Sequence, residues 1–182
     1  VREQLADLYL RADMTQDATR QLEAILRERP TNERALFVLG GIKRQLDKLE
    51  EAAAHFETVL KINPKFELAY YELAGVRLFQ NKPSITLSTL KKAGEQFKPK
   101  FITKFYAGLA HSSLHQYPKA IENLLDAEEL AQASEQNRLT HFFYFQLGAA
   151  YERNRQYETA NDTFNKAIEM SPDYHNAMNY LG

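Results

Sequence analysis

Residues 144–172 read YFQLGAAYERNRQYETANDTFNKAIEMSP, and the order of large, small and proline residues in this stretch decides the fold. A small residue, Gly148, is followed twelve positions later by Ala160, and the large apolar Phe164 comes four positions after that. Pro172 closes the stretch. The apolar spacing predicts two amphipathic helices joined by a short polar turn.

The same skeleton recurs along the chain at a spacing close to 34 residues. The closing prolines Pro30 and Pro64 are 34 positions apart, and Pro99 follows 35 positions later. The first small residue of each unit stands at Ala6, Gly40, Ala74, Gly108, Gly148 and Gly182. A period of this length indicates a solenoid of helix pairs, because each unit buries its apolar face against its neighbours.

These landmarks resemble the pattern of the tetratricopeptide repeat (TPR) family, and the resemblance extends over essentially the whole chain. It implies an all-α fold: a right-handed α-solenoid of antiparallel helix pairs, the TPR superhelix, with about five repeats and the start of a sixth. We expect a single solenoid domain over residues 1–182. Its repeats are expected at approximately 1–32, 33–66, 67–100, 101–138 with an insertion, 139–174, and a partial repeat at 175–182.

Local residues refine the expected helix boundaries. In the second unit we expect helices at 33–45 and 49–62, the latter ended by Pro64. Pro83 and Pro118 fit the first turn of a helix, where proline costs no hydrogen bond. From Gly108 to Gly148 the spacing is 40 residues. We interpret the six extra residues as a longer second helix in the fourth unit, or a longer first helix in the fifth, that protrudes from the stack.

Composition excludes several classes of function. The chain has 23 basic and 24 acidic residues, so no general attraction to nucleic acid or to an anionic membrane is expected. It has no cysteine and no apolar run long enough to cross a membrane. His111 and His115, expected four apart on one helix, have no evident third ligand, so we expect no metal. The sequence has no glycine-rich phosphate loop, no nucleophile elbow and no pair of carboxylates set in an apolar pocket, so we expect no cofactor and no enzyme active site.

The chain opens without methionine and stops at Gly182, inside the expected first helix of a sixth unit. We therefore expect it to be a piece of a longer protein. The closing motif, residues 176–182, resembles repeats of bacterial proteins, including exported ones. Either the cytoplasm or the periplasm would fit.

A row of aromatic residues marks the candidate binding surface. Three positions before the small residue, four consecutive units carry Phe37, Tyr71, Phe105 and Phe145. Apolar residues three positions earlier, and arginines toward the far end, extend the predicted groove: Leu68, Phe142, Arg44 and Arg153. Neighbouring small residues such as Gly41 should leave indentations beside the rings. Alternatively, the rings pack against the adjacent first helix and thicken the core.

The favoured function is a protein–protein interaction scaffold or adaptor that binds a peptide segment of a partner in the aromatic-lined concave groove. Two alternatives remain open. The chain could be a self-association module that forms a homo-oligomer, or a non-catalytic regulatory part of a larger enzyme.

Overall fold

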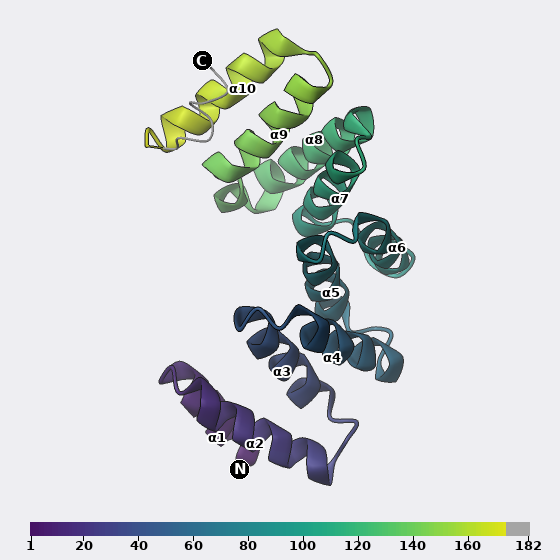
Figure 1. Ribbon diagram of the computed structural model, residues 1–182, viewed down its shortest axis with the longest axis vertical. Helices are drawn as coiled ribbons and strands as arrows, with labels where there is room; N and C mark the ends of the chain where they lie inside the picture. The colour runs from purple at the N-terminus through teal and green to yellow at the C-terminus, as the bar shows by residue number, and fades with distance from the viewer. Residues whose placement is uncertain (174–182) are drawn as a thin grey trace. The chain divides into compact units, whose positions relative to one another are not determined.

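The computed structural model describes residues 1–173, and this part of the chain contains ten α-helices, one short 3₁₀ helix and no strand (Figure 1). The predicted start of a sixth repeat, residues 175–182, lies outside the described residues. The helices are α1 (Arg2–Arg11), α2 (Thr15–Glu28), α3 (Glu33–Gln45), α4 (Leu49–Ile62), α5 (Glu67–Phe79), α6 (Pro83–Gly94), α7 (Phe101–Ser113), α8 (Tyr117–Ser134), the 3₁₀ helix η1 (Gln136–Arg138), α9 (His141–Arg153) and α10 (Tyr157–Met170).

Helix boundaries follow local chemistry. The helices α3 and α4 have the bounds expected from the sequence. Asn32 caps α3, since its side chain accepts a hydrogen bond of 2.8 Å from the Ala35 amide. Pro83 and Pro118 stand in the first turns of α6 and α8, which confirms their predicted role in starting helices.

A left-handed residue closes the turn inside each of five helix pairs. These residues, all with φ between 55° and 63°, are Asp13, Asp47, Asn81, His115 and Arg155. In each turn the next amide donates to a carbonyl five residues back, as Lys48 does to Lys43 at 2.8 Å and Gln156 to Tyr151 at 2.9 Å. The amide of the left-handed residue itself donates to the carbonyl three residues back, as Asp47 does to Arg44. The two bonds together form the Schellman arrangement, which satisfies the last carbonyls of a helix.

The chain divides into two compact units. Unit 1 comprises Val1–Lys82 and Lys91–Phe97, and unit 2 comprises Pro83–Leu90 and the residues from Lys98 onward. The assignment of residues 1–182 to one solenoid domain stays a prediction.

In unit 1, α1 packs on α2 and α3 packs on α4, and the core continues from α4 to α5. One cluster of buried side chains joins the first pair to α3 through Leu22, Ile25 and Leu39. Another joins α4 to α5 through Phe56 and Leu73. Complete burial of a ring such as that of Phe56 contributes about 1.5–3 kcal/mol to stability.

Glycines at the predicted small positions allow close approach of the paired helix. A Cβ placed on Gly40 would lie 2.7 Å from the ring of Phe56, and one on Gly148 would lie 2.7 Å from the ring of Phe164. Gly108 stands in the same relation to Leu124. The small and large landmarks of the repeat are therefore partners in one contact, sixteen residues apart.

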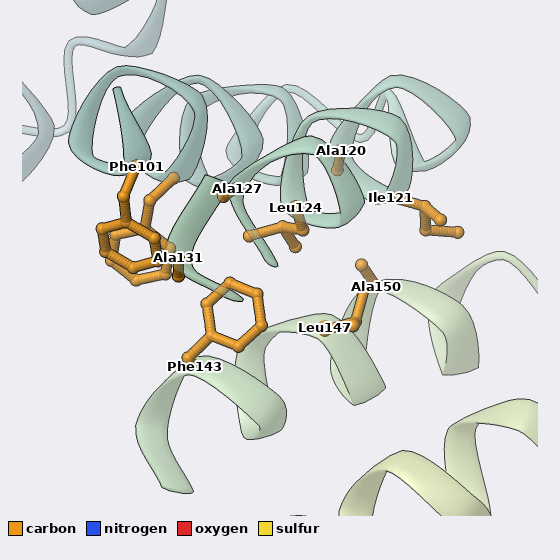
Figure 2. Packing of buried hydrophobic residues seen from close by; sticks show 10 residues of the cluster. Phe101, Ala120, Ile121, Leu124, Ala127, Ala131, Phe143, Leu147 and Ala150 are labelled. Atoms are coloured by element: carbon orange, nitrogen blue, oxygen red, sulfur yellow. The ribbon is translucent and has the colours of Figure 1, made fainter. Parts of the chain in front are cut away.

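In unit 2, α7 packs on α8 and α9 packs on α10, with α8 also against α9 (Figure 1). The helix α8 has 18 residues, whereas the other second helices have 12 to 14, which confirms the first of the two interpretations of the insertion. The expectation that the extra turn protrudes is wrong. Ala131 in this turn and Ala127 one turn before it are fully buried, and Figure 2 shows Ala131 beside Phe101 with the ring of Phe143 below it. An alanine stripe lets α9 come close enough to cover this end of α8.

Candidate protein-interaction surface

A hollow of about 360 Å³ lies among the first helices of unit 1. Its apolar lining is Leu10, Phe37, Val38, Gly41, Ile42 and Phe56. Its polar lining is Asp13, Thr15, Arg44, Gln45 and Glu72. This size is at the lower end of the roughly 300–1,000 Å³ typical of ligand sites. We call it the Gly41 hollow.

The hollow exists because position 41 has no side chain. A Cβ built on Gly41 meets no heavy atom within 4 Å, in contrast to the crowded Gly40 next to it. Phe37, one turn earlier, is half-buried, and its ring centroid lies 5.0 Å from that of Phe66 and 5.6 Å from that of Phe56. One side of Phe37 is therefore packed into the core while the side chain also lines the hollow.

The charged side chains that line the hollow carry one more negative charge than positive charge. Arg44 Nε lies 3.1 Å from Glu72 Oε2, so these two charges compensate one another. Asp13, in the left-handed turn after α1, is exposed and forms no ion pair with any described residue. Counting only the charged residues of the lining, one negative charge is left over.

The next first helix of unit 1 carries one exposed and one buried candidate. Leu68 on α5 is 56% exposed, so it is available to a partner. Tyr71 is only 6% exposed, and its hydroxyl donates to Glu67 Oε1 at 2.5 Å. Burial, followed by this hydrogen bond and the charge of Glu67, raises the pKa of Tyr71 far above its ordinary value.

In unit 2 the equivalent candidates form an aromatic patch on α7 and α9. Phe105 is 9% exposed, because it stacks on Phe101 at 5.3 Å and packs on Phe143 at 5.8 Å. Phe142 is 44% exposed and meets Phe105 edge-on at 6.3 Å. Phe145 is half-buried against Phe164, with ring centroids 5.8 Å apart.

The expectation that all four predicted rings stay accessible is therefore wrong. Tyr71 and Phe105 are buried, as the alternative interpretation of core packing requires, whereas Phe37 and Phe145 are half-buried. Arg44 and Arg153 are exposed at the far ends of their helices. A role of any of these residues in binding a partner stays a prediction.

The two histidines do not share a helix face. The helix α7 ends at Ser113, and His115 lies in the left-handed turn beyond it. His111 Nδ1 lies 2.8 Å from Gln116 Oε1, and His115 Nδ1 lies 2.7 Å from the Tyr117 hydroxyl. Within residues 1–173, no group of three or more His, Cys, Asp or Glu side chains is arranged to hold a metal ion.

Among the described residues, no helix combines the length and the apolar character of a bilayer-spanning segment.

Several residues of the hollow were missed from the sequence. Asp13 and Glu72 stand at positions that are not equivalent to Arg44 in the repeat, so the period alone does not bring them together. The ion pair between Arg44 and Glu72 joins the adjacent first helices α3 and α5. The only feature of the sequence that would have indicated this ion pair is the presence of opposite charges in neighbouring repeats.

Comparison with known proteins identifies the repeat. Residues 3–78 and residues 141–174 each match the tetratricopeptide repeat. A search of the curated proteins found no match.

Solved structures share the fold at low sequence identity. MamA from Desulfovibrio magneticus RS-1 (residues 41 to the end) superposes with a TM-score of 0.82 at 22% identity, covering 95% of this chain and 94% of that one. YrrB, described as a TPR protein with an unusual peptide-binding site, gives 0.79 at 18% identity, with coverage of 98% and 89%. TTC0263, a TPR protein of Thermus thermophilus, gives 0.70 at 20% identity, with coverage of 99% and 95%.

These likenesses confirm the predicted fold class, an α-solenoid of antiparallel helix pairs. Together with the matched segments, they show that the chain belongs to the tetratricopeptide repeat family.

Proposed function

We propose that this chain is a non-catalytic protein–protein interaction scaffold that binds a segment of a partner protein on its first helices. The observation that carries the proposal is the Gly41 hollow, since it offers apolar side chains and an open helix position on the face where solenoids of this kind bind their partners. YrrB, a protein of the same fold, is described as having a peptide-binding site, which supports the same class of function.

Exposed apolar side chains extend the proposed surface in each unit. Leu68 on α5 and Phe142 on α9 hold equivalent positions in their repeats, and both are exposed. Apolar anchors that become buried on binding dominate the energy of most interfaces, and truncating one typically costs about 2 kcal/mol or more at the centre. The binding energy should come mainly from their burial.

Affinity capture with matched variants tests this function. The immobilised chain and three variants would be exposed to lysate of the source organism, and retained proteins quantified by mass spectrometry. A partner held by the first helices should be lost with Leu68→Ser or Phe142→Ser. It should be kept with the control Leu125→Ser, which changes a side chain 41% exposed on the second helix α8.

Retention of every captured protein by both first-helix variants would contradict the proposal. Light scattering of the purified chain over a concentration series separates it from self-association, because a scaffold of this kind should stay monomeric. A mass that rises with concentration would favour the homo-oligomer.

A further inference from the structure

We infer that the Gly41 hollow selects a partner segment in which a bulky apolar side chain is flanked by lysine or arginine. The inference rests on the proposed function and specifies its ligand. Three observations carry it: an open helix position, an apolar lining beneath that position, and an uncompensated negative charge beside it.

The first step concerns the shape of the hollow. Equivalent positions in the other repeats are occupied or covered: Asp7 is paired with Arg34, Leu109 and Ala149 pack onto core clusters, and Gly75 is buried. At Gly41 the first helix offers vacant space, and the ring of Phe37 lines the same hollow. This vacancy makes Gly41 the residue that determines which side chain fits.

The second step concerns the chemistry of the lining. Ile42 and Phe56 are buried beneath the hollow, and Phe37 and Leu10 are half-buried at its walls. None of these side chains offers a hydrogen-bonding group. A polar side chain placed against these four residues would lose its water without a replacement, because the polar lining, including Thr15 and Gln45, comes from other residues. Leucine, isoleucine, methionine or phenylalanine would gain apolar contact there.

The third step concerns charge. The Arg44–Glu72 pair is mutually compensated, and Asp13 remains as an exposed carboxylate at the edge of the hollow. A basic residue next to the apolar anchor would be attracted to Asp13, and an acidic residue would be repelled. Since an exposed ion pair is weak, this charge adjusts the choice of partner more than the strength of binding.

A random 12-residue peptide library displayed on phage provides the probe. It would be selected on the full chain, and the enriched sequences would be synthesised with a fluorescent label. Their affinities would be measured by anisotropy against the parent chain and three variants. Gly41→Leu fills the hollow, Asp13→Asn removes the charge while keeping a residue that tolerates the left-handed turn, and Gly94→Leu is the control at an equally open glycine outside the hollow.

The inference expects enriched peptides to share a bulky apolar residue with lysine or arginine close by. Gly41→Leu should lower their affinity on the order of 30-fold or more. Asp13→Asn should lower it about two- to fivefold, and less so at high salt. Gly94→Leu should leave it unchanged. Thermal melting should show that Gly41→Leu is at least as stable as the parent, since leucine favours helix over glycine.

Different failures point to different conclusions. Enriched peptides that bind Gly41→Leu as tightly as the parent, or that carry acidic flanks, would overturn this inference and leave the scaffold function standing. If no peptide binds the parent chain, the inference and the proposed function fail together.

Discussion

Two adjacent glycines in α3 serve opposite purposes. Gly40 faces the core, where the ring of Phe56 occupies the space of its missing side chain, whereas Gly41 faces the hollow and meets nothing. The sequence marks Gly40 by the 34-residue period, but it does not distinguish a glycine that is needed for packing from one that is not. Only the contacts of each position make that distinction.

Alanine substitutions at these two glycines should change stability in opposite directions. Gly40→Ala puts a methyl group against a fully buried ring, and overpacking of this kind costs about 1–3 kcal/mol. Gly41→Ala should stabilise the protein by up to about 1 kcal/mol through helix propensity. Urea unfolding followed by circular dichroism would measure both. Equal effects of the two variants would refute the assignment of faces.

The four aromatic candidates show what a period cannot predict. Phe37, Tyr71, Phe105 and Phe145 are equivalent in the repeat, yet two are buried and two are half-buried. Phe105 is covered because Phe101, four residues earlier, stacks on it. The periodic position fixes the direction in which a side chain leaves the helix, and the neighbours in each repeat fix how much of it remains exposed.

A tyrosine of α9 should make stability depend on alkaline pH. Burial and then the charge of Glu128, whose Oε1 accepts a 3.0 Å hydrogen bond from the hydroxyl, raise the pKa of Tyr144 from 10.0 to about 12. The folded state thus holds this proton more tightly than the unfolded state. The stability it contributes is complete below pH 10 and is lost as pH rises toward 12.

Comparison of the parent with Tyr144→Phe tests this dependence. Urea midpoints measured from pH 8 to pH 12 should fall more steeply for the parent than for the variant above pH 10. Parallel curves would mean that Tyr144 ionises equally in both states. Tyr71 and Tyr151 also have raised pKa values, so some alkaline loss should remain in the variant.

At the scale of helices and turns, the helices were predictable and the turns between them were not. Prolines and the pairing of small with large residues give α3 and α4 their predicted bounds. The left-handed turn residues escaped notice because four residue types occupy five equivalent positions: aspartate twice, asparagine, histidine and arginine. Their common feature is a backbone angle, which leaves no fixed residue type in the sequence.

Glycine at the last of these turns should stabilise the protein. Arg155 has φ of 63°, a conformation that costs a residue with a side chain roughly 1–2 kcal/mol relative to glycine. Arg155→Gly should therefore raise the free energy of unfolding by about 1 kcal/mol. Asp47→Gly is the matched control, and its gain should be smaller because aspartate tolerates this region better. A lower melting temperature for Arg155→Gly would contradict this account.

The insertion in the fourth repeat was predicted in position but not in packing. The helix α8 has 18 residues, four more than the 14 of α2, α4 and α10, and Ala127 and Ala131 allow close contact with α9. The sequence shows that these residues favour helix, but Ala127 and Ala131 carry too little apolar surface to indicate burial by themselves. Their burial depends on Phe143, which approaches from the next first helix.

For the whole molecule, contacts are local along the chain. In the part that the structure describes, every buried apolar cluster lies within one of the two units. Stability of such a protein is approximately a sum over repeats and the contacts between neighbouring repeats. A mutation in one buried cluster should consequently destabilise mainly the helices that form that cluster.

Hydrogen exchange of two matched variants would show this locality. Phe143→Leu in unit 2 and Phe56→Leu in unit 1 each replace a fully buried ring by a smaller side chain. Each should lower the free energy of unfolding by about 1–2 kcal/mol. Phe143→Leu should accelerate exchange mainly in α7 to α9, and Phe56→Leu mainly in α3 to α5. The same uniform acceleration from both variants would show that the chain unfolds as one cooperative block.

The turns closed by main-chain bonds have a consequence for how such repeats diverge. Because amide and carbonyl groups hold each corner, four residue types can stand at the left-handed position, and no fixed residue marks the corner in the sequence. At these corners the five helix pairs therefore resemble one another in the path of the backbone and not in the residue type.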